Sequence, residues 1–141
     1  MATMSVHLRT LPDTQAAVGR SGTHTIVVDR PAGKAGGLGL GFNGGELLAL
    51  AIGGCLCNDL QYVAHEMGVE LASIAVDVQV SFEGSPALAT SALVTVEATA
   101  REQDAVIDEV VRKAIDSSTV SNSIQRGVDV RTSVRRPESG A

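Results

Sequence analysis

The fold of this chain is decided by the stretch Glu46-Leu-Leu-Ala-Leu-Ala-Ile-Gly-Gly-Cys55-Leu-Cys-Asn-Asp59, which opens an apolar run that ends at Met67. Apolar residues recur in it at the spacing of one helix face, namely Leu48, Ile52, Leu56, Val63 and Met67. Leu47 and Leu50 lie on other sides, so we expect a central helix covered by more than one layer. Glycine costs a helix interior about 1 kcal/mol relative to alanine. Gly53 and Gly54 therefore indicate close approach of another backbone or of a substrate.

The length of 141 residues predicts a single domain over residues 1–141, long enough to bury a core. Apolar residues make up 44% of the chain but aromatic residues only 2%. The core must therefore be built from Val, Leu, Ile and Ala. The segment from Arg135 to Ala141 is expected to be a frayed tail.

Charge and composition argue against several classes of partner. The formal net charge is −5 and no basic patch stands out, which argues against nucleic acid. Residues Met1 to Pro12 lack the pattern of a signal peptide, and no uninterrupted apolar stretch reaches the roughly 18 residues of a membrane span. Cys55 and Cys57 lie too close together in the sequence to cross-link distant parts of a domain by a disulfide. Free thiols suit a reducing cytoplasm. We therefore expect a cytoplasmic protein without a nucleic-acid or membrane partner.

The rest of the chain predicts an α+β fold with a mostly antiparallel sheet. Alternation and turn residues predict strands at Ser5–Leu11, Thr14–Val18, Thr23–Asp29, Ile74–Phe82, Leu88–Thr99 and Val128–Val134. Helical spacing predicts further helices at Val106–Ile115 and from the cap residues Ser117-Ser118-Thr119 to Gln125. The first hairpin is expected to turn at Gly19-Arg20-Ser21-Gly22, and Arg30–Asn43 to form a glycine-rich loop. The long apolar helix is too large for one small sheet, which indicates burial against a second copy of the chain.

Two motifs give weak evidence for a bound group. Gly39-x-Gly41-x-x-Gly44 matches the dinucleotide-binding pattern, but the nearest predicted strand ends about ten residues earlier and no βαβ unit follows. Cys55, Cys57 and His65 have the chemistry of zinc ligands, but residues i and i+2 of a helix diverge by roughly 160–200°. We therefore expect neither a cofactor nor a metal.

Cys55 is the candidate reactive residue of the chain. It lies at the edge of the apolar helix face, and Asp59 follows one turn later on the same side. A carboxylate on a largely apolar face needs a partner, so Asp59 is an unusual residue there. The alternative is that Cys55 is an ordinary core residue, since free cysteine is among the most buried residue types.

These residues resemble the motif of the OsmC/Ohr family of hydroperoxide-detoxifying proteins. The stretch from Glu46 to Cys55 looks like the motif that precedes the reactive cysteine of that family. The nearest branch is that of the small OsmC-like proteins, whose motif has Glu-Leu, then Gly-Gly-Cys, and an aspartate four residues after the cysteine; in this chain five residues separate Glu46-Leu47 from Gly53-Gly54-Cys55. Asp59 matches that aspartate, and the order of predicted elements agrees with the family from Ser5 to Val134.

The resemblance implies an intertwined homodimer with the long helices in its centre and two active sites at the subunit interface. In such proteins a cysteine, matched here by Cys55, attacks the distal oxygen of an organic hydroperoxide and becomes a sulfenic acid, which thiols reduce. An arginine from the first hairpin of the other subunit favours the nucleophilic thiolate, and Arg20 matches that arginine. Our hypothesis is that Asp59 orients or neutralises Arg20. Apolar walls that favour organic hydroperoxides over hydrogen peroxide are expected from Leu56, Leu60 or Phe42.

Two departures from the family pattern affect the expected chemistry. The family's resolving cysteine falls at Ser118 of this chain, and serine can cap a helix but cannot form a disulfide. Cys57 points away from Cys55, so a two-cysteine cycle is not available within one chain. The peroxidase branch carries a glutamate ten residues before the cysteine, where this chain has Gly45. Glu46 is turned by about 100° from that position, and we keep it only as a supporting residue.

The sequence leaves three functions open. The first is thiol-dependent reduction of organic hydroperoxides, in which an external thiol directly reduces oxidised Cys55 and Arg20 activates it. The second is a non-catalytic dimer that senses redox state or binds a small apolar ligand, which the serine at position 118 favours. The third is a structural dimer without chemistry. The presence of both Cys55 and Arg20 favours the first.

Overall fold

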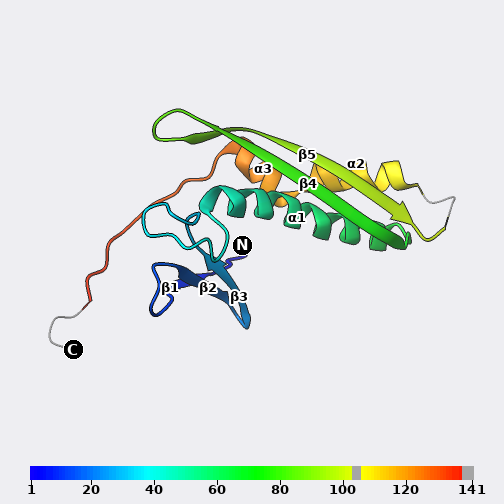
Figure 1. Cartoon of the computed structure of the whole chain (residues 1–141). Helices are drawn as coiled ribbons and strands as arrows, with labels where there is room; N and C mark the ends of the chain where they lie inside the picture. The colour runs from blue at the N-terminus through cyan, green and yellow to red at the C-terminus, as the bar shows by residue number, and fades with distance from the viewer. Residues whose placement is uncertain (103–105, 138–141) are drawn as a thin grey trace.

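The computed structural model describes residues 1–102 and 106–137 of the chain. The elements follow the order β1 (His7–Thr10), β2 (Ala17–Ser21), β3 (His24–Val28), α1 (Gly44–Glu66), β4 (Leu71–Glu83), β5 (Leu88–Ala100), α2 (Ile107–Ser117) and α3 (Thr119–Arg126). One antiparallel sheet has the order β1-β2-β3, and β4 and β5 form a second antiparallel sheet. Helices α1, α2 and α3 lie on one side of the β4–β5 hairpin, and the first sheet lies near the N-terminal half of α1 (Figure 1). This arrangement confirms the predicted α+β fold.

Helix α1 begins at a capping box. The side chain of Asn43 accepts a hydrogen bond of 2.9 Å from the backbone N–H of Glu46, and the Glu46 carboxylate accepts one of 3.1 Å from the N–H of Asn43. These bonds satisfy two N–H groups near the start of the helix. Glu66 is the last helical residue, and Gly68 follows with a φ of +69°, a left-handed conformation that suits glycine. The predicted long helix is confirmed, with a start two residues earlier than expected.

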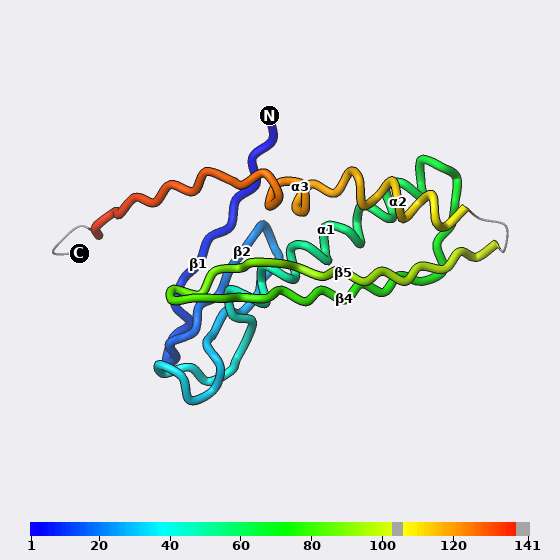
Figure 2. Tube along the Cα trace, turned by 90° about the horizontal axis from the view of Figure 1, so that it is seen from above, coloured from blue at the N-terminus to red at the C-terminus, as the bar shows by residue number. Residues whose placement is uncertain are grey.

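The hairpin of β4 and β5 covers one face of α1. Its strands pair from Leu71↔Ala100 to Glu83↔Leu88, and alternate residues of β4 are half-buried, as the sequence predicts. Viewed from above, α1 and α2 run alongside the hairpin (Figure 2). Helix α1 packs against both β4 and α2 and is therefore covered by more than one layer. The buried core cluster consists of Leu56, Leu60, Val63, Ala64, Val110 and Ala114.

Helix α1 is also long and apolar enough to cross a membrane, judged by length and composition alone. The core helix of a soluble protein passes the same test. In this fold Leu56, Leu60 and Val63 of α1 are buried among α2 and the hairpin strands. Helix α1 therefore occupies the position of a core helix.

The first hairpin turns later than the sequence predicts. Strand β2 pairs with β3 up to Ser21↔His24, so Gly22 and Thr23 form a two-residue connection. Gly22 has a φ of +58°, and short hairpin turns of this kind need such positive φ values. The expected four-residue turn is therefore wrong, and Arg20 belongs to strand β2 rather than to a turn.

The predicted last strand at Val128–Val134 is also wrong for the single chain. The described residues after α3 form neither helix nor strand, and Val128, Val130 and Val134 are 66%, 81% and 88% exposed. The segment runs away from the hairpin and the helices (Figures 1 and 2). A strand needs a neighbouring strand to satisfy its backbone groups, and the described chain offers none along this path. Of the expected tail at 135–141, residues 138–141 lie outside the described residues.

The glycine-rich loop after β3 is organised by a buried carboxylate. Asp29 is only 4% exposed, and its side chain accepts hydrogen bonds of 2.8 to 3.0 Å from the backbone N–H groups of Arg30, Leu38 and Leu40. The N–H of Leu40 does most to lower the pKa of the Asp29 carboxyl, helped by the other two N–H groups and the Arg30 charge, whereas burial opposes the shift. The Arg30 guanidinium also donates a 2.7 Å hydrogen bond to the carbonyl of Gln15. The Asp29 carboxylate thus binds backbone groups both at the start of the loop and towards its end.

Gly41 explains part of the glycine motif in this loop. A Cβ atom at Gly41 would overlap the carbonyl of Val27, and the N–H of Phe42 donates a 3.0 Å hydrogen bond to that carbonyl. The backbone of the loop therefore lies directly against β3. The loop predicted at Arg30–Asn43 is confirmed, and its glycine at position 41 is a packing requirement.

The two glycines before Cys55 differ in their surroundings. A Cβ atom at Gly53 would lie 3.0 Å from Cγ2 of Val78 on β4. Gly54 is exposed, and a Cβ atom there would meet nothing within 4 Å. The expected close approach is confirmed for Gly53, and nothing in the described chain explains Gly54.

We expect Gly53→Ala to lower the midpoint of thermal unfolding relative to Gly54→Ala. Overpacking a filled position costs about 1–3 kcal/mol, whereas alanine at an uncovered helix position gains up to about 1 kcal/mol over glycine. Circular dichroism of both variants beside the wild type would measure the two midpoints. Equal midpoints, or the reverse order, would contradict the packing of Gly53 against β4.

We expect Asp29→Asn to lower the urea midpoint near neutral pH, because an amide cannot replace a charged acceptor of three N–H groups. The folded-state pKa of Asp29 lies below its unfolded value of about 3.9. Its stabilisation is therefore complete above that value and disappears as the pH falls through the folded-state pKa. Urea titrations at about pH 7 and about pH 3 should show the gap between wild type and variant narrowing at the lower pH. An equal difference in urea midpoint at both pH values would refute this role. The control is Asp77→Asn, which changes an exposed carboxylate on β4.

Candidate active site

Cys55 lies in the middle of α1 and faces the side chain of Asp59. Both residues are part-buried, and the Cys55 Sγ donates a hydrogen bond of 3.4 Å to Oδ2 of Asp59. They are separated by one helical turn, so their side chains lie one above the other. The predicted placement of Asp59 beside Cys55 is therefore confirmed.

Ser118 is the second polar neighbour of the Cys55 sulfur. The residue is 1% exposed, and its Oγ lies 3.8 Å from Sγ of Cys55, a long hydrogen bond of the kind that sulfur accepts. Ser118 occupies the N-cap position of α3, but its side chain makes no capping bond. The expected capping role is therefore wrong, because the hydroxyl points to the sulfur instead.

Asn122 fixes the backbone of Ser118, a role that the sequence analysis missed. Its backbone N–H and its side-chain amide donate hydrogen bonds of 3.1 Å and 2.8 Å to the carbonyl of Ser118. The amide also bonds the carbonyl of Asp116 at 3.1 Å. The available signal was an asparagine in the first turn of a predicted helix, where its side chain can reach backbone groups.

Cys57 does not take part in this cluster. Cys55 and Cys57 are both free thiols, and they lie two residues apart on one helix. Among the residues that the structure describes, no group of three His, Cys, Asp or Glu side chains could hold a metal ion. Cys55 therefore meets a carboxylate and a hydroxyl, and not a second thiol.

Arg20 and Glu46 are not brought to Cys55 within the described chain. Arg20 is exposed on β2, in the separate first sheet, and the polar partners of the Cys55 sulfur are Asp59 and Ser118. Glu46 lies about 13 Å along the helix from Cys55 by the rise per residue, and its carboxylate belongs to the capping box. Its role in this chain is therefore to start α1. The expected pairing of Asp59 with Arg20 is not made by one chain.

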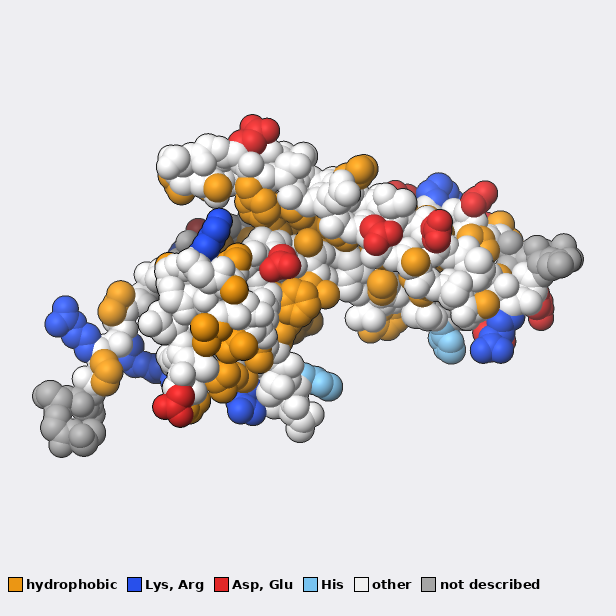
Figure 3. Space-filling view, viewed as in Figure 1, with side chains coloured by type: hydrophobic (Ala, Val, Ile, Leu, Met, Phe, Trp, Pro, Cys, Tyr) orange, Lys and Arg blue, Asp and Glu red, His pale blue; other side chains and the backbone are white. Residues whose placement is uncertain are grey.

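A cavity lined by Ser118 lies on the α3 side of the cluster. Its volume is about 390 Å³, and Leu56 lines it together with polar residues that include Ser118, Asn122 and Gln125. An adjoining, more apolar cavity of about 540 Å³ is lined by Leu48 and Ile52 of α1 and Ile124 of α3. Apolar side chains gather beneath the free end of the β4–β5 hairpin (Figure 3). Leu56 thus lines the cavity beside Ser118. Leu60 does not, because it is fully buried in the core.

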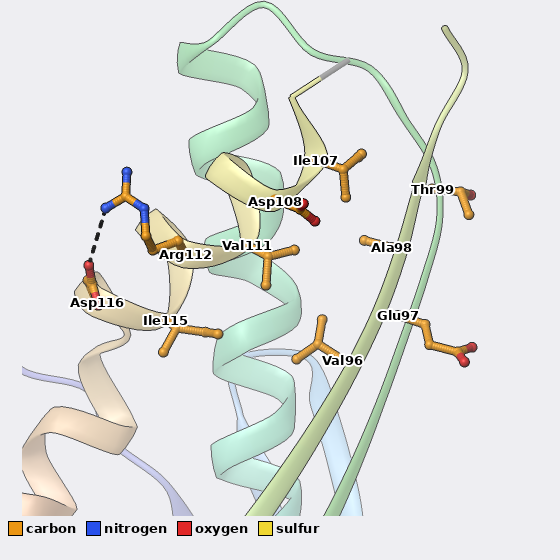
Figure 4. A pocket seen from close by; sticks show the side chains of 10 residues that line it. All are labelled: Val96, Glu97, Ala98, Thr99, Ile107, Asp108, Val111, Arg112, Ile115 and Asp116. Carbon is orange, nitrogen blue, oxygen red and sulfur yellow. Dashed lines mark ion pairs between the residues drawn. The ribbon is translucent and has the colours of Figure 1, made fainter. Parts of the chain in front are cut away.

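A third cavity lies away from this cluster, between α2 and β5. Its volume is about 630 Å³, and Val96, Val111 and Ile115 form its apolar floor. Charged side chains, including the Arg112–Asp116 ion pair of 3.8 Å, lie at its rim (Figure 4). None of the predicted site residues lines it.

Comparison with known proteins identifies the family. The family model described as OsmC-like protein matches residues 36–133. The chain belongs to the OsmC-like protein family. This match confirms the resemblance drawn from the motif around Cys55. Proteins of this family are soluble.

Solved structures share the fold at low sequence identity. An OsmC-like protein from Mycoplasma pneumoniae superposes with a TM-score of 0.72 at 16% identity over 88% of each chain. An organic hydroperoxide resistance protein OsmC from Legionella pneumophila gives 0.61 at 21% identity over 93% of this chain and 95% of that one. The organic hydroperoxide resistance protein OhrB of Bacillus subtilis gives 0.56 at 23% identity over 92% and 96%. No curated protein sequence matches the chain.

We expect Ser118→Cys to form a disulfide with Cys55 on oxidation. The present Oγ–Sγ distance is 3.8 Å, and a small side-chain rotation would bring two sulfurs to the bonding distance of about 2.05 Å. In a Cys57→Ser background, diamide should remove both free thiols that Ellman's reagent detects after unfolding. The matched control is Ser117→Cys, because the exposed Ser117 hydroxyl bonds the carbonyl of Lys113 instead. Two free thiols surviving in both variants would contradict the contact.

Proposed function

We propose that this protein reduces organic hydroperoxides with Cys55 as the reacting thiol, in a cycle that uses one cysteine. The observation that carries the proposal is the Cys55 sulfur held between Asp59 and Ser118, where Ser118 also lines a cavity that adjoins a more apolar one. Membership of the OsmC-like family, some of whose structural relatives are named organic hydroperoxide resistance proteins, supports a role in peroxide or oxidative stress. Together these features favour a peroxidatic thiol over a core cysteine.

The proposed cycle uses external thiols for both of its later steps. The Cys55 thiolate attacks the distal peroxide oxygen, the O–O bond breaks, and an alcohol and a Cys55 sulfenic acid result. Ser118 offers a hydroxyl where a resolving thiol would be needed, and Cys57 lies elsewhere on the helix. A first external thiol therefore condenses with the sulfenic acid, giving a mixed disulfide and water. A second thiol displaces the first as a small disulfide and restores Cys55.

The apolar space between α1 and α3 supports an organic substrate rather than hydrogen peroxide. Leu56 and Ser118 both line the cavity of about 390 Å³, and the Ser118 hydroxyl touches the Cys55 sulfur. An alkyl or aryl group placed in the adjoining apolar space would bury its surface while the peroxide group faces the sulfur. Hydrogen peroxide has no such group and gains nothing from this space.

We also propose that two copies form a homodimer in which Arg20 of one chain activates Cys55 of the other. In residues 1–43, all of which the structure describes, no large apolar side chain is fully buried. Small sheets need an apolar face packed on another element for stability. The exposed valines after α3 are a further surface that a second copy would cover. A guanidinium delivered in this way would stabilise the thiolate.

The proposed surroundings are a reducing cytoplasm. Cys55 and Cys57 are both free thiols, which persist where cellular reductants keep cysteines reduced. The one-cysteine cycle needs the same small thiols as its reductant. We propose no cofactor and neither a nucleic-acid nor a membrane partner.

A non-catalytic dimer that senses redox state or binds a small apolar ligand is the second candidate. The hydroxyl of Ser118 at the sulfur favours it, because a sulfenic acid without a resolving thiol can persist as a signal. Peroxide turnover separates the two candidates. A sensor would form sulfenate once and would consume peroxide only in proportion to protein.

We expect Cys55→Ser to abolish consumption of cumene hydroperoxide in the presence of dithiothreitol, because the attacking sulfur is lost. Cys57→Ser is the matched control and should retain the wild-type rate, since Cys57 takes no part in the cluster. Residual peroxide can be followed with ferrous xylenol orange. A Cys55→Ser variant as active as the wild type would rule out the proposed function.

We expect Arg20→Ala and Cys55→Ser to be inactive alone and to regain activity when they are unfolded and refolded together. A mixed dimer contains one intact site, in which the Cys55 of the first variant meets the Arg20 of the second. The same peroxide assay measures the recovery, and Arg9→Ala on exposed β1 is the control for Arg20→Ala. No recovery in a mixture shown to contain mixed dimers would contradict action across subunits.

A further inference from the structure

We propose that Asp59 is the residue that moves the proton in this reaction, taking it from the Cys55 sulfur and returning it to the leaving oxygen. The inference rests on the proposed function and adds a catalytic residue to it. The Cys55 Sγ donates its 3.4 Å hydrogen bond to Oδ2 of Asp59. An ionised carboxylate only accepts hydrogen bonds, so the thiol proton already points at the atom that receives it.

The charge balance of the site favours passing the thiol proton to Asp59 over losing it to solvent. Asp59 forms no ion pair with the cations of residues 1–102 and 106–137. An ionised Asp59 beside a thiolate would place two like charges together in a part-buried site, which disfavours both. Transfer of the proton from Sγ to Oδ2 leaves a single negative charge, now on sulfur. Arg20 of a second copy would stabilise that charge further.

The neutral Asp59 then serves as the proton donor when the peroxide reacts. The sulfur lone pair forms a bond to the distal oxygen of ROOH, the O–O bond breaks, and its electron pair leaves on the RO oxygen. The proton held by Asp59 passes to that oxygen, which departs as ROH. Sulfur has lost two electrons to the peroxide, Cys55 is a sulfenic acid, and Asp59 is ionised again. The proton balance therefore closes within the Cys55–Asp59 pair.

Ser118 acts in this scheme as a positioning residue. Its Oγ reaches the same sulfur at 3.8 Å from the α3 side, and two hydrogen bonds from Asn122 hold its carbonyl in place. Leu56 and Leu60, the neighbours of Cys55 and Asp59 along α1, are buried and fix the orientation of the helix. The sulfur is thus held by two separate elements, with its proton on the side of Asp59.

A comparison of leaving groups tests the role of Asp59. The full-length protein and Asp59→Asn would be reacted with tert-butyl hydroperoxide and with 3-chloroperoxybenzoate, and sulfenate formation would be followed by trapping with dimedone. The alkoxide leaving group needs a proton, whereas the carboxylate leaving group does not. We expect Asp59→Asn to slow the reaction with the hydroperoxide about 100-fold, the scale of general acid–base catalysis, and the reaction with the peracid much less. Asp59→Glu should restore part of the loss.

Two further variants keep the outcomes distinct. Asp77→Asn, which changes an exposed carboxylate on β4, should leave both rates unchanged. If Asp59→Asn slowed sulfenate formation by the same factor with both oxidants, Asp59 would have a structural role and the proposed proton relay would be overturned. Unchanged rates with both oxidants would overturn it as well. Sulfenate formation that survives Cys55→Ser, or that is absent from the wild type, would instead defeat the proposed function itself.

Discussion

Helix α1 meets strand β4 at Gly53, where the missing side chain lets Val78 approach the helix backbone. This contact sets the depth at which the helix sits, and Leu56 and Leu60 then reach the core that α2 shares. Cys55 and Asp59 each precede one of these leucines, so they are turned by about 100° from the buried direction. They stay part-buried and face one another along the helix. The same helical spacing therefore places Leu56 and Leu60 in the core and Cys55 beside Asp59.

The corner between α2 and α3 supplies the other half of the site. Val110 and Ala114 anchor α2 in the same core as α1, and the chain then takes an extended conformation at Ser118 before α3 begins. That one extended residue delivers a hydroxyl to the Cys55 sulfur. Both elements of the site therefore depend on a single cluster of aliphatic side chains, and a cavity in that cluster would disturb the sulfur as well as the fold.

Local patterns predicted local features well, and features that need a distant partner poorly. Alternation identified β4 because its partner β5 follows directly in the chain, but the same alternation at Val128–Val134 did not indicate whether a neighbouring strand exists. The pairing of Cys55 with Asp59 follows from the helical period. The contact with Ser118 spans 63 residues and has no pattern of its own, so only the family resemblance pointed there. Asp29 was missed because its partners are backbone N–H groups of a glycine-rich loop.

The two-residue connection at Gly22 determines which surface of the first sheet carries a guanidinium. Side chains alternate along a strand. Arg20 therefore lies on the same face of the sheet as Val18, and the buried Gly19 belongs to the opposite face. Insertion or deletion of one residue between Ala17 and Gly22 would exchange the two faces. The Arg20 guanidinium would then lie on the opposite face of the sheet, although the arginine itself is unchanged. The spacing within this short strand is therefore constrained as tightly as the arginine itself.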